Sequence, residues 1–282
     1  MQSLQGRVAV VTGSANGIGR ALATELAGEG MKLVLADIEK EPLELAAKEL
    51  ERNGTDVLPV VTDVSDAWSV DALAAAAVDR FGAVHVLCNN AAVAGQFGRA
   101  WATSIAEWEW VFAVNVMGVV NGIRAFVPII LEQDEGHVLN TGSAACYEAL
   151  PGFGPYAASK HAVLGLSEAL RRELHAAGAR VGVTVGMPAG VVKTSIMTGQ
   201  RNWLDRFGER PPADDDPLPS AIRGGFDAAV AGGNDPALCA RAFVDGIKQD
   251  LYLVCDDMAQ MAEWSERHAK QGHGEKPVWP PT

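Results

Sequence analysis

Tyr156 and Lys160 have the residue types and the spacing for acid–base chemistry on one helix. Side chains four residues apart lie on the same helix face, so the ammonium group of Lys160 can stand beside the phenol of Tyr156. A free tyrosine has a pKa near ~10, and bringing it to neutrality requires roughly 4 kcal/mol of phenolate stabilisation. A neighbouring positive charge supplies stabilisation of that kind. The pair is therefore a candidate for moving a proton to or from a substrate oxygen.

A second chemical signature lies near the amino terminus, where the glycine-rich run TGSANGIG occupies residues 12–19 between a strand-like and a helical pattern. Gly13 permits the tight bend, Gly17 lets the backbone approach a pyrophosphate, and Gly19 lets the helix pack closely on the strand. The helix amino end presents free N–H groups and a positive dipole to phosphates. In this context the run predicts a dinucleotide site, with a ligand-free glycine turn as the alternative.

The residues after the next two strand-like runs favour NAD over NADP. Asp37 ends the second run, where a carboxylate can accept both hydroxyls of the adenosine ribose and repels a 2′-phosphate. Ile38 follows it, and residues 14–18 contain no Lys or Arg, so the basic residues of an NADP pocket are missing. Asp63 follows the third run with Val64 beside it, and could accept from the adenine amino group. Each aspartate could instead cap the next helix.

The elements that must hold these groups alternate along the chain. Short runs rich in Val and Leu have the length and composition of strands buried on both faces, at residues 7–12, 31–37, 57–63, 84–90, 137–143, 180–188 and 251–256. Helical patterns lie between them, at residues 17–29, 40–53, 66–81, 104–132 and 157–177. This alternation predicts an α/β fold with right-handed crossovers. We expect a single doubly wound Rossmann-type domain over residues 1–282, with a seven-stranded parallel sheet.

The alternation fails from Thr194 to about Pro236, where no clear helix or strand pattern is present. The segment follows the carboxyl end of a strand, where open α/β sheets bind ligands, and irregular segments of this length are usually functional or disordered. A plain exposed loop would leave its apolar side chains in water. We predict a substrate lid at about residues 194–236, with an acidic loop as the alternative, and a C-terminal extension at 257–282 that begins as a helix. The candidate lid contacts are Ile196, Met197, Trp203 and Phe207.

The bulk properties exclude several classes of protein. The formal net charge is −12 and the pI is about 4.9, which argues against nucleic acid or an anionic membrane as a partner. The four cysteines are scattered without metal-ligand spacing, so neither a metal site nor a disulfide is expected. We see no signal peptide and no apolar run near the ~20 residues that cross a bilayer, and therefore expect a cytoplasmic protein.

Taken together, the motifs resemble the short-chain dehydrogenase/reductase family over residues 4–256. The signatures stand in the family's order: TGSANGIG at 12–19, Asn89-Asn90-Ala91-Ala92, Asn115, Ser143, Tyr156 with Lys160, and Pro188 with Thr194. The resemblance implies that Tyr156 is the base in alcohol oxidation and the acid in ketone reduction. It also implies that Lys160 bonds the nicotinamide ribose, Ser143 donates to the substrate oxygen, and Asn115 holds a water that links Lys160 to solvent.

The resemblance also implies a set of cofactor contacts, with two departures from the family's pattern. Ala92 stands where the family usually has glycine, and Thr194 lies six residues after Pro188 instead of five. The second departure leaves open whether Val191 or Val192 contacts the carboxamide. The implied contacts are Gly13, Asn16, Gly17, Ile18, Gly19, Asp37, Ile38, Asp63, Val64, Asn90, Ala91, Ala92, Tyr156, Lys160, Pro188, Val191 and Thr194.

The expected activity is NAD-dependent hydride transfer between the cofactor and a secondary alcohol or ketone, with a bulky, lipophilic or aryl substrate implied by analogy within the family. One alternative is an NADP-dependent carbonyl reductase. Another is a regulator that senses NAD without turnover, although such proteins typically lose the Tyr or Lys of the pair. Apolar residues extend beyond one stripe on the helices at 104–132 and 157–177, which predicts that each buries a second face. The family resemblance implies that these helices pair across a subunit interface, so we expect a homotetramer or a homodimer.

Overall fold

A seven-stranded parallel sheet forms the centre of the computed structural model, which describes residues 1, 3–212 and 217–272. Its strands lie in the order β3-β2-β1-β4-β5-β6-β7. Each of the seven predicted runs forms one strand, which confirms the doubly wound Rossmann-type fold. The strands are β1 Val8–Thr12, β2 Lys32–Asp37, β3 Val57–Val61, β4 Val86–Asn89, β5 Gly136–Thr141, β6 Val181–Met187 and β7 Leu253–Cys255.

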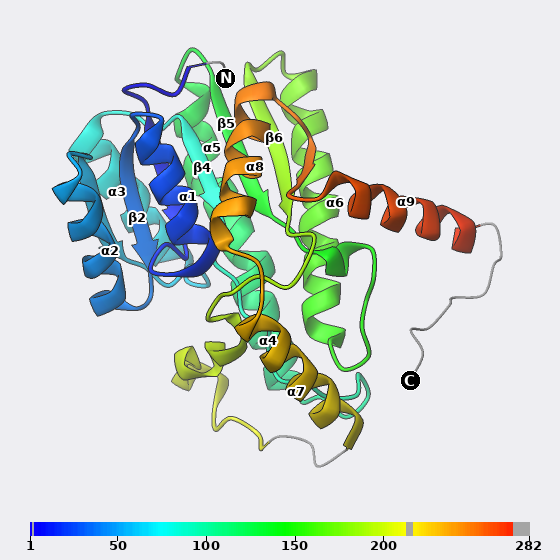
Figure 1. Cartoon of the computed structure of the whole chain (residues 1–282). Helices are drawn as coiled ribbons and strands as arrows, with labels where there is room; N and C mark the ends of the chain where they lie inside the picture. The colour runs from blue at the N-terminus through cyan, green and yellow to red at the C-terminus, as the bar shows by residue number, and fades with distance from the viewer. Residues whose placement is uncertain (2, 213–216, 273–282) are drawn as a thin grey trace.

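Helices cover both faces of this sheet (Figure 1). One face packs against α1 Gly17–Gly28, α2 Lys40–Arg52 and α8 Pro236–Gln249. The other packs against α3 Ala67–Phe81, α5 Gly118–Leu131 and α6 Gly154–Ala176. Strand residues alternate between the two cores, so that β1 sends Ala9 and Val11 to the first face and Val8 and Val10 to the second. Both faces of the sheet are buried, as its continuous apolar runs predict.

A long helix runs from Ile105 to Leu131 through α4 Ile105–Phe112, the π-helical turn η1 Ala113–Met117 and α5. By length and composition alone it could cross a membrane, so the expectation that no apolar run has this length was wrong. The helix contacts α3, α6, β4 and β5, and 44% of its most apolar window is buried in the protein. These contacts are typical of a core helix.

The segment after β6 is more ordered than its sequence predicts. It forms the 3₁₀ turns η3 Ile196–Asn202 and η4 Asp205–Phe207, and then α7 Pro217–Ala231. The prediction of an irregular segment through Pro236 was therefore wrong for α7 and for the start of α8. Among the side chains of α7 whose burial is described, only Ile222, Phe226 and Val230 are partly buried, and the small residues and glycines between them obscure the helical pattern. Residues 213–216 of the predicted lid lie outside the described residues.

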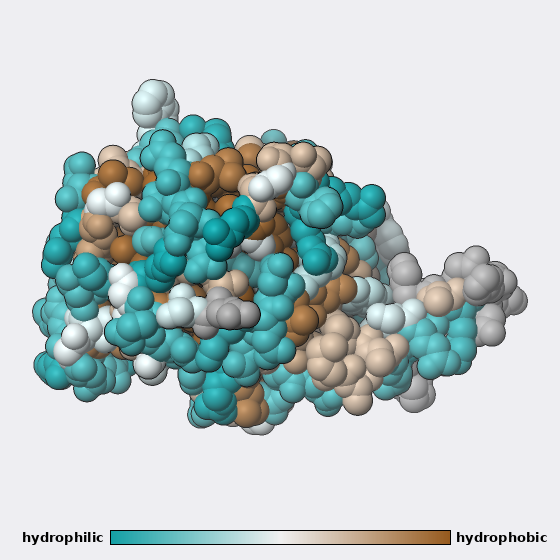
Figure 2. Space-filling view, turned by 90° about the horizontal axis from the view of Figure 1, so that it is seen from above, coloured by the Kyte–Doolittle hydropathy of each residue, from teal (hydrophilic) through white to brown (hydrophobic). Residues whose placement is uncertain are grey.

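The C-terminal helix α9 Met258–Gly272 projects away from the sheet and its flanking helices (Figure 1). Its Trp264 is buried and stacks on Tyr147, with 6.5 Å between the ring centroids, which attaches α9 to the body. Residues 273–282 of the predicted extension lie outside the described residues. Seen from above, the surface is mostly hydrophilic, with hydrophobic residues showing in patches between polar ones (Figure 2).

Candidate active site

Tyr156, Lys160 and Ser143 come together where the carboxyl end of β5 meets the first turns of α6. The Lys160 ammonium lies 5.7 Å from the centroid of the Tyr156 ring, and it donates to the carbonyl oxygen of Thr141 at 2.9 Å. Ser143 is the N-cap of a short 3₁₀ turn, and its side chain also forms a hydrogen bond with that of Tyr156. The three side chains that sequence reasoning grouped are thus within one cluster.

Burial controls the charge of this pair more than mutual attraction does. Desolvation raises the pKa of Tyr156 to about 12, although its hydrogen bond to Ser143 opposes the rise. Desolvation also lowers the pKa of Lys160 to about 8. The spacing of Tyr156 and Lys160 predicts that the ammonium group helps to lower the pKa of Tyr156, and in the protein alone that pKa moves the other way. Tyr156 is therefore a neutral acid until another positive charge reaches it.

Asn115 lies in the π-helical turn η1 and is 1% exposed. Its Oδ1 accepts from the Val93 N–H at 2.8 Å, and its Nδ2 donates to the Val93 carbonyl at 2.9 Å and to Ser159 Oγ at 3.0 Å. The side chain therefore fastens the loop after β4 to α6, beside the Tyr156–Lys160 pair. The water-holding role implied by the family resemblance stays a prediction.

The glycine-rich turn has the backbone that a pyrophosphate requires. Gly13 and Gly17 have φ values of +66° and +56°, and a Cβ added at Gly13 would come within 2.8 Å of the Ala91 Cα. Gly19 packs against the Gly13 carbonyl oxygen, which leaves no room for a side chain. Within the described chain, Asn16 makes no side-chain hydrogen bond to the first turn of α1, and that turn contains no acidic residue. The helix amino end fits an anionic phosphate group.

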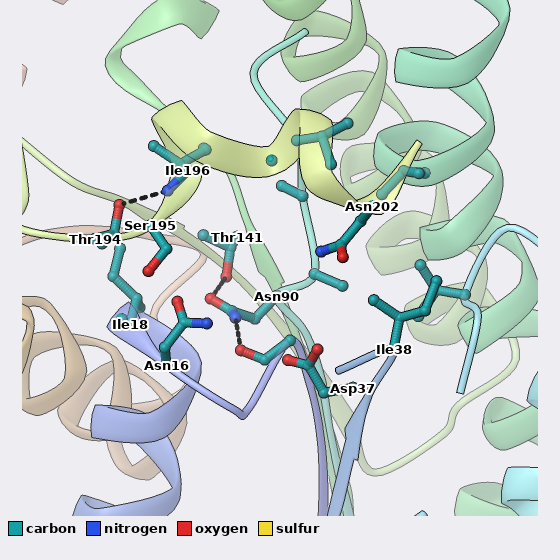
Figure 3. Close-up of a pocket in the computed structure, with 18 of the residues that line it drawn as sticks. Asn16, Ile18, Asp37, Ile38, Asn90, Thr141, Thr194, Ser195, Ile196 and Asn202 are labelled. Carbon is teal, nitrogen blue, oxygen red and sulfur yellow. Dashed lines mark hydrogen bonds between the residues drawn. The ribbon is translucent and has the colours of Figure 1, made fainter. Parts of the chain in front are cut away.

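Asn90 locks together the strand ends beneath this turn. Its Nδ2 donates to the Thr12 carbonyl at 3.0 Å. Its Oδ1 accepts from Thr141 Oγ1 at 3.2 Å (Figure 3). The N–H groups of Asn90 and Ala91 both donate to Thr12 Oγ1. The carboxyl ends of β1, β4 and β5 are therefore joined by hydrogen bonds through Asn90, at the base of the site.

Asp37 stands at the end of β2 and is held by the backbone. It accepts from the N–H groups of Ala15 and Glu39, each at 3.0 Å, while burial raises its pKa. The N-cap of α2 is Glu39, so the reading of Asp37 as a helix cap was wrong. A carboxylate held in this way has remaining acceptor capacity, which suits the hydroxyls of a ribose.

Asp63 follows β3 and accepts from the Ser65 N–H at 3.0 Å. The N-cap of α3 is Asp66, whose side chain accepts from the Trp68 N–H, so the capping alternative was wrong for Asp63 as well. The second carboxylate oxygen of Asp63 pairs with Arg206 at 3.1 Å. That partner comes from the segment after β6.

A basic side chain reaches the β2 end of the site, which the sequence argument did not anticipate. Arg201 of η3 pairs with Glu39 and also interacts electrostatically with Asp37. The absence of Lys and Arg from residues 14–18 therefore does not mean that the site lacks a basic residue. Arg201 lies 162 positions after Glu39 in the chain and reaches the site through the fold. No local signal in the sequence identifies it.

A single cleft runs across the carboxyl ends of the strands and brings most of the predicted residues together. Those that line it are Gly13, Asn16, Gly17, Ile18, Asp37, Ile38, Asp63, Val64, Asn90, Ala91, Ala92, Tyr156, Lys160, Pro188, Thr194 and Ile196. Lining residues that sequence reasoning missed are Glu39, Thr62, Val93, Trp110, Val114, Thr141, Gly142, Ser195, Gly199, Arg201, Asn202 and Leu204. Among the described residues, predicted ones that do not line it are Gly19, Asn115, Ser143, Val191, Met197, Trp203 and Phe207.

Trp203 and Phe207 of the predicted lid face α4. Trp203 lies 5.2 Å from Trp110 and 5.7 Å from Phe207, measured between ring centroids, in a cluster that includes Val93 and Val111. These two predicted substrate contacts therefore anchor the segment to the body of the protein. Trp110 belongs to the core and also lines the cleft.

A different aromatic group stands next to Tyr156. Phe153 lies 5.8 Å from the Tyr156 ring, and Phe226 of α7 lies 4.8 Å from Phe153. Phe97 completes the group at 4.2 Å from Phe153. Helix α7 therefore reaches the neighbourhood of the reactive tyrosine through Phe226.

Comparison with known proteins adds independent evidence. The family model described as short chain dehydrogenase matches residues 7–205. The chain is 39% identical over 198 residues to a 1-deoxy-11-beta-hydroxypentalenate dehydrogenase from Streptomyces exfoliatus, covering 70% of this chain and 71% of that one. It is 34% identical over 197 residues to a CLA biosynthesis dehydrogenase/reductase from Lactiplantibacillus plantarum, covering 70% and 68%.

A solved structure matches the chain over its full length. This short chain dehydrogenase/reductase from Burkholderia phymatum, in complex with NAD, has 38% identity and a TM-score of 0.94, with all of both chains covered. A levodione reductase structure has 28% identity and a TM-score of 0.75, covering 92% of this chain and 98% of that one.

Proposed function

The chain belongs to the short-chain dehydrogenase/reductase family, and we propose on that premise that it is an NAD-dependent oxidoreductase of a secondary alcohol/ketone pair. The observation that carries the proposal is that Tyr156 and Lys160, with Ser143 bonded to Tyr156 from outside the lining, stand at one end of a cleft whose other end is formed by Asp37 and the glycine-rich turn. The Tyr156 end of the cleft can transfer a proton, and the Asp37 end can hold a dinucleotide.

Each part of the cleft has a role in this proposal. The amino end of α1 would hold the pyrophosphate, Asp37 the adenosine ribose, and Lys160 the nicotinamide ribose. The bound coenzyme supplies hydride transfer, and its oxidised nicotinamide carries a positive charge. Ser143 would donate a hydrogen bond to the substrate oxygen.

The protein's own chemistry is then a proton transfer at the Tyr156 hydroxyl. In ketone reduction Tyr156 gives its proton to the substrate oxygen, which suits the neutral form that burial favours. In alcohol oxidation Tyr156 must first be ionised, and positive charge beside it stabilises that form. Burial lowers the pKa of Lys160 to about 8, so this side chain can lose and regain a proton near neutral pH and pass the proton onwards.

The preference for NAD is supported by two carboxylates at the adenosine end, Asp37 and Glu39. Both would repel a 2′-phosphate. Arg201, the basic group that could attract one, is engaged by both oxygens of Glu39, at 2.7 and 2.6 Å. An NADP-dependent carbonyl reductase is the alternative, and it requires Arg201 to leave Glu39.

We propose a bulky, lipophilic or aryl substrate. Support comes from Phe97, Phe153 and Phe226, which provide apolar aromatic surface next to Tyr156. The Streptomyces exfoliatus relative is named for a hydroxypentalenate substrate. The lid proposed for residues 194–236 would enclose such a molecule through α7.

The test is a panel of cyclic, aryl and short aliphatic secondary alcohols, each assayed for NADH or NADPH formation with the purified protein. Formation of NADH with the bulky alcohols is the expected result. Tight NAD binding without turnover, unchanged in Tyr156→Phe, would instead identify a sensor of NAD.

We also propose a homotetramer or a homodimer in the cytoplasm. Val116, Val120, Leu164 and Leu166 remain partly exposed on two helices of one face, which suits a contact between subunits. The four cysteines are buried free thiols, as is usual in a reducing compartment. Sedimentation of the purified protein as a monomer only would refute the oligomer.

A further inference from the structure

The residues from Ile196 to Arg210, here called the clasp segment, cross over the dinucleotide end of the cleft. The chain reaches this segment from β6 through Thr194, whose side chain faces Gly17 of the glycine-rich turn. Its first turn then runs above Asn90 towards Asp37 and Ile38 (Figure 3). Arg201, Asn202 and Leu204 line the cleft from this side. The segment therefore covers the end proposed to hold adenosine, away from the aromatic group beside Tyr156.

Arg201 ties the clasp segment to the end of β2. Its Nε and Nη2 donate to the two carboxylate oxygens of Glu39 at 2.7 and 2.6 Å, a bidentate arrangement. Asn202 also forms a hydrogen bond with Glu39, and these contacts lower the pKa of the Glu39 carboxyl. Glu39 lies two residues after Asp37, so this contact closes the ribose end directly.

Arg206 makes a similar connection to the end of β3. Its guanidinium pairs with Asp63 at 3.1 Å and donates to Ser65 Oγ. The Arg201 and Arg206 side chains are 37% and 44% exposed. Their carboxylate partners Glu39 and Asp63 are 19% and 21% exposed, so both pairs border solvent and open more readily than a fully buried pair.

Arg210 provides the third connection, whose carboxylate partner is fully enclosed while the arginine itself is 28% exposed. It pairs at 2.8 Å with Glu107 of α4, a carboxylate that is 1% exposed. Its guanidinium lies 5.9 Å from the Trp110 ring centroid and 5.7 Å from that of Trp203. Breaking a buried pair is costly, because it leaves an uncompensated charge. This end of the segment is therefore a fixed anchor, and the part carrying Arg201 and Arg206 can move about it.

We propose that the clasp segment forms the outer wall of the adenosine site, and that coenzyme enters and leaves only when the Arg201–Glu39 and Arg206–Asp63 pairs open. The inference rests on the proposed function, because it concerns the same coenzyme site. Glu39 and Asp63 engage the guanidinium groups of Arg201 and Arg206, so replacing either arginine removes a contact within the protein and no predicted contact with the coenzyme. Weakening them should speed entry and release together and leave the equilibrium affinity nearly unchanged.

The test measures NADH binding kinetics by stopped-flow fluorescence and affinity by calorimetry, in Arg201→Gln and Arg206→Gln. Entry and release should each become about five-fold faster, the factor that ~1 kcal/mol represents, with Kd within about two-fold of the parent protein. The matched control is Arg80→Gln on α3. This change breaks an exposed pair with Asp56 and should alter neither rate. In Arg201→Gln/Glu39→Gln the acceleration should equal that of Arg201→Gln, because both changes break one pair.

Hydrogen exchange in the free protein gives a second readout, since residues 196–206 should exchange faster in both variants and not in the control. A weaker Kd with an unchanged entry rate would make the arginines direct coenzyme ligands and overturn the gate. Unchanged rates and unchanged exchange would also overturn it. If the parent protein binds neither NADH nor NADPH, the proposed function fails, and the exchange experiment still decides whether the two pairs hold the segment.

Discussion

The ammonium group of Lys160 donates to the carbonyl oxygen of Thr141 at 2.9 Å, at the last residue of β5. This bond positions a buried charge against the sheet edge next to the Tyr156 ring. A helix residue is thereby held by a strand end, and the reactive pair is aligned with the cleft.

Removing the Tyr156 hydroxyl should abolish turnover without removing coenzyme binding. In Tyr156→Phe we expect kcat to fall by at least about 10³-fold, because proton transfer has lost its donor. NADH affinity, measured by fluorescence titration, should stay within about three-fold, since the pyrophosphate and ribose contacts remain. Retained turnover would assign the proton transfer to another group.

The rate of alcohol oxidation should rise with pH, and the rate of ketone reduction should fall. Oxidation needs the ionised tyrosine, and burial raises the pKa of Tyr156 to about 12 in the protein alone. The positive coenzyme lowers that value, so the oxidation profile should level off below pH 12. Initial rates with NAD between about pH 6 and 10 test this, and a flat profile would argue against a tyrosine base.

Replacing Lys160 with Met should stabilise the free protein while it inactivates the enzyme. Folding lowers the pKa of Lys160 from 10.5 to about 8, so the folded state binds this proton less tightly than the unfolded chain. Below about pH 8 both states are protonated, and the folded state bears the full cost of the buried charge. Stability of the parent protein therefore rises from about pH 8 to 10.5.

Urea unfolding at pH 7 should show Lys160→Met to be up to about 3 kcal/mol more stable. The difference should shrink above about pH 8 and vanish near pH 10.5. A less stable variant at pH 7 would mean that the hydrogen bond to Thr141 outweighs desolvation.

Asn115→Ala should destabilise the protein by about 2–4 kcal/mol, because it leaves the N–H and carbonyl of Val93 without their buried partners. Chemical denaturation measures the loss. The control is Asn53→Ala at the exposed end of α2, for which we expect a change within about 0.5 kcal/mol. Similar effects in both variants would contradict the proposal that Asn115 holds the loop after β4 through its hydrogen bonds to Val93.

Asp37→Ser should shift coenzyme preference towards NADP by at least about ten-fold in the ratio of kcat/KM values, since it removes a carboxylate from the ribose site. The matched control is Asp79→Ser, an exposed position on α3 with the same change in net charge. An unchanged ratio would mean that Glu39 and Arg201, and not Asp37, determine the preference between NAD and NADP.

The sequence by itself determined the features that depend on near neighbours. Apolar runs of strand length predict all seven strands, because strands buried on both faces need side chains that are apolar at successive positions. The glycine-rich turn is identifiable from residues 12–19 alone, and the four-residue spacing of Tyr156 and Lys160 places them on one helix face. The long-range grouping of Ser143 with this pair came from the family resemblance.

Only the tertiary structure decided which distant side chains meet and how their charges respond. Arg201 and Glu39 are 162 positions apart, and no periodic pattern records that they form a pair. Helix α7 packs on the body of the protein through the contacts of Phe226 with Phe97 and Phe153, which are more than 70 positions away along the chain. The rise in the pKa of Tyr156 follows from desolvation, which depends on the atoms packed around a group in three dimensions and not on its neighbours along the chain.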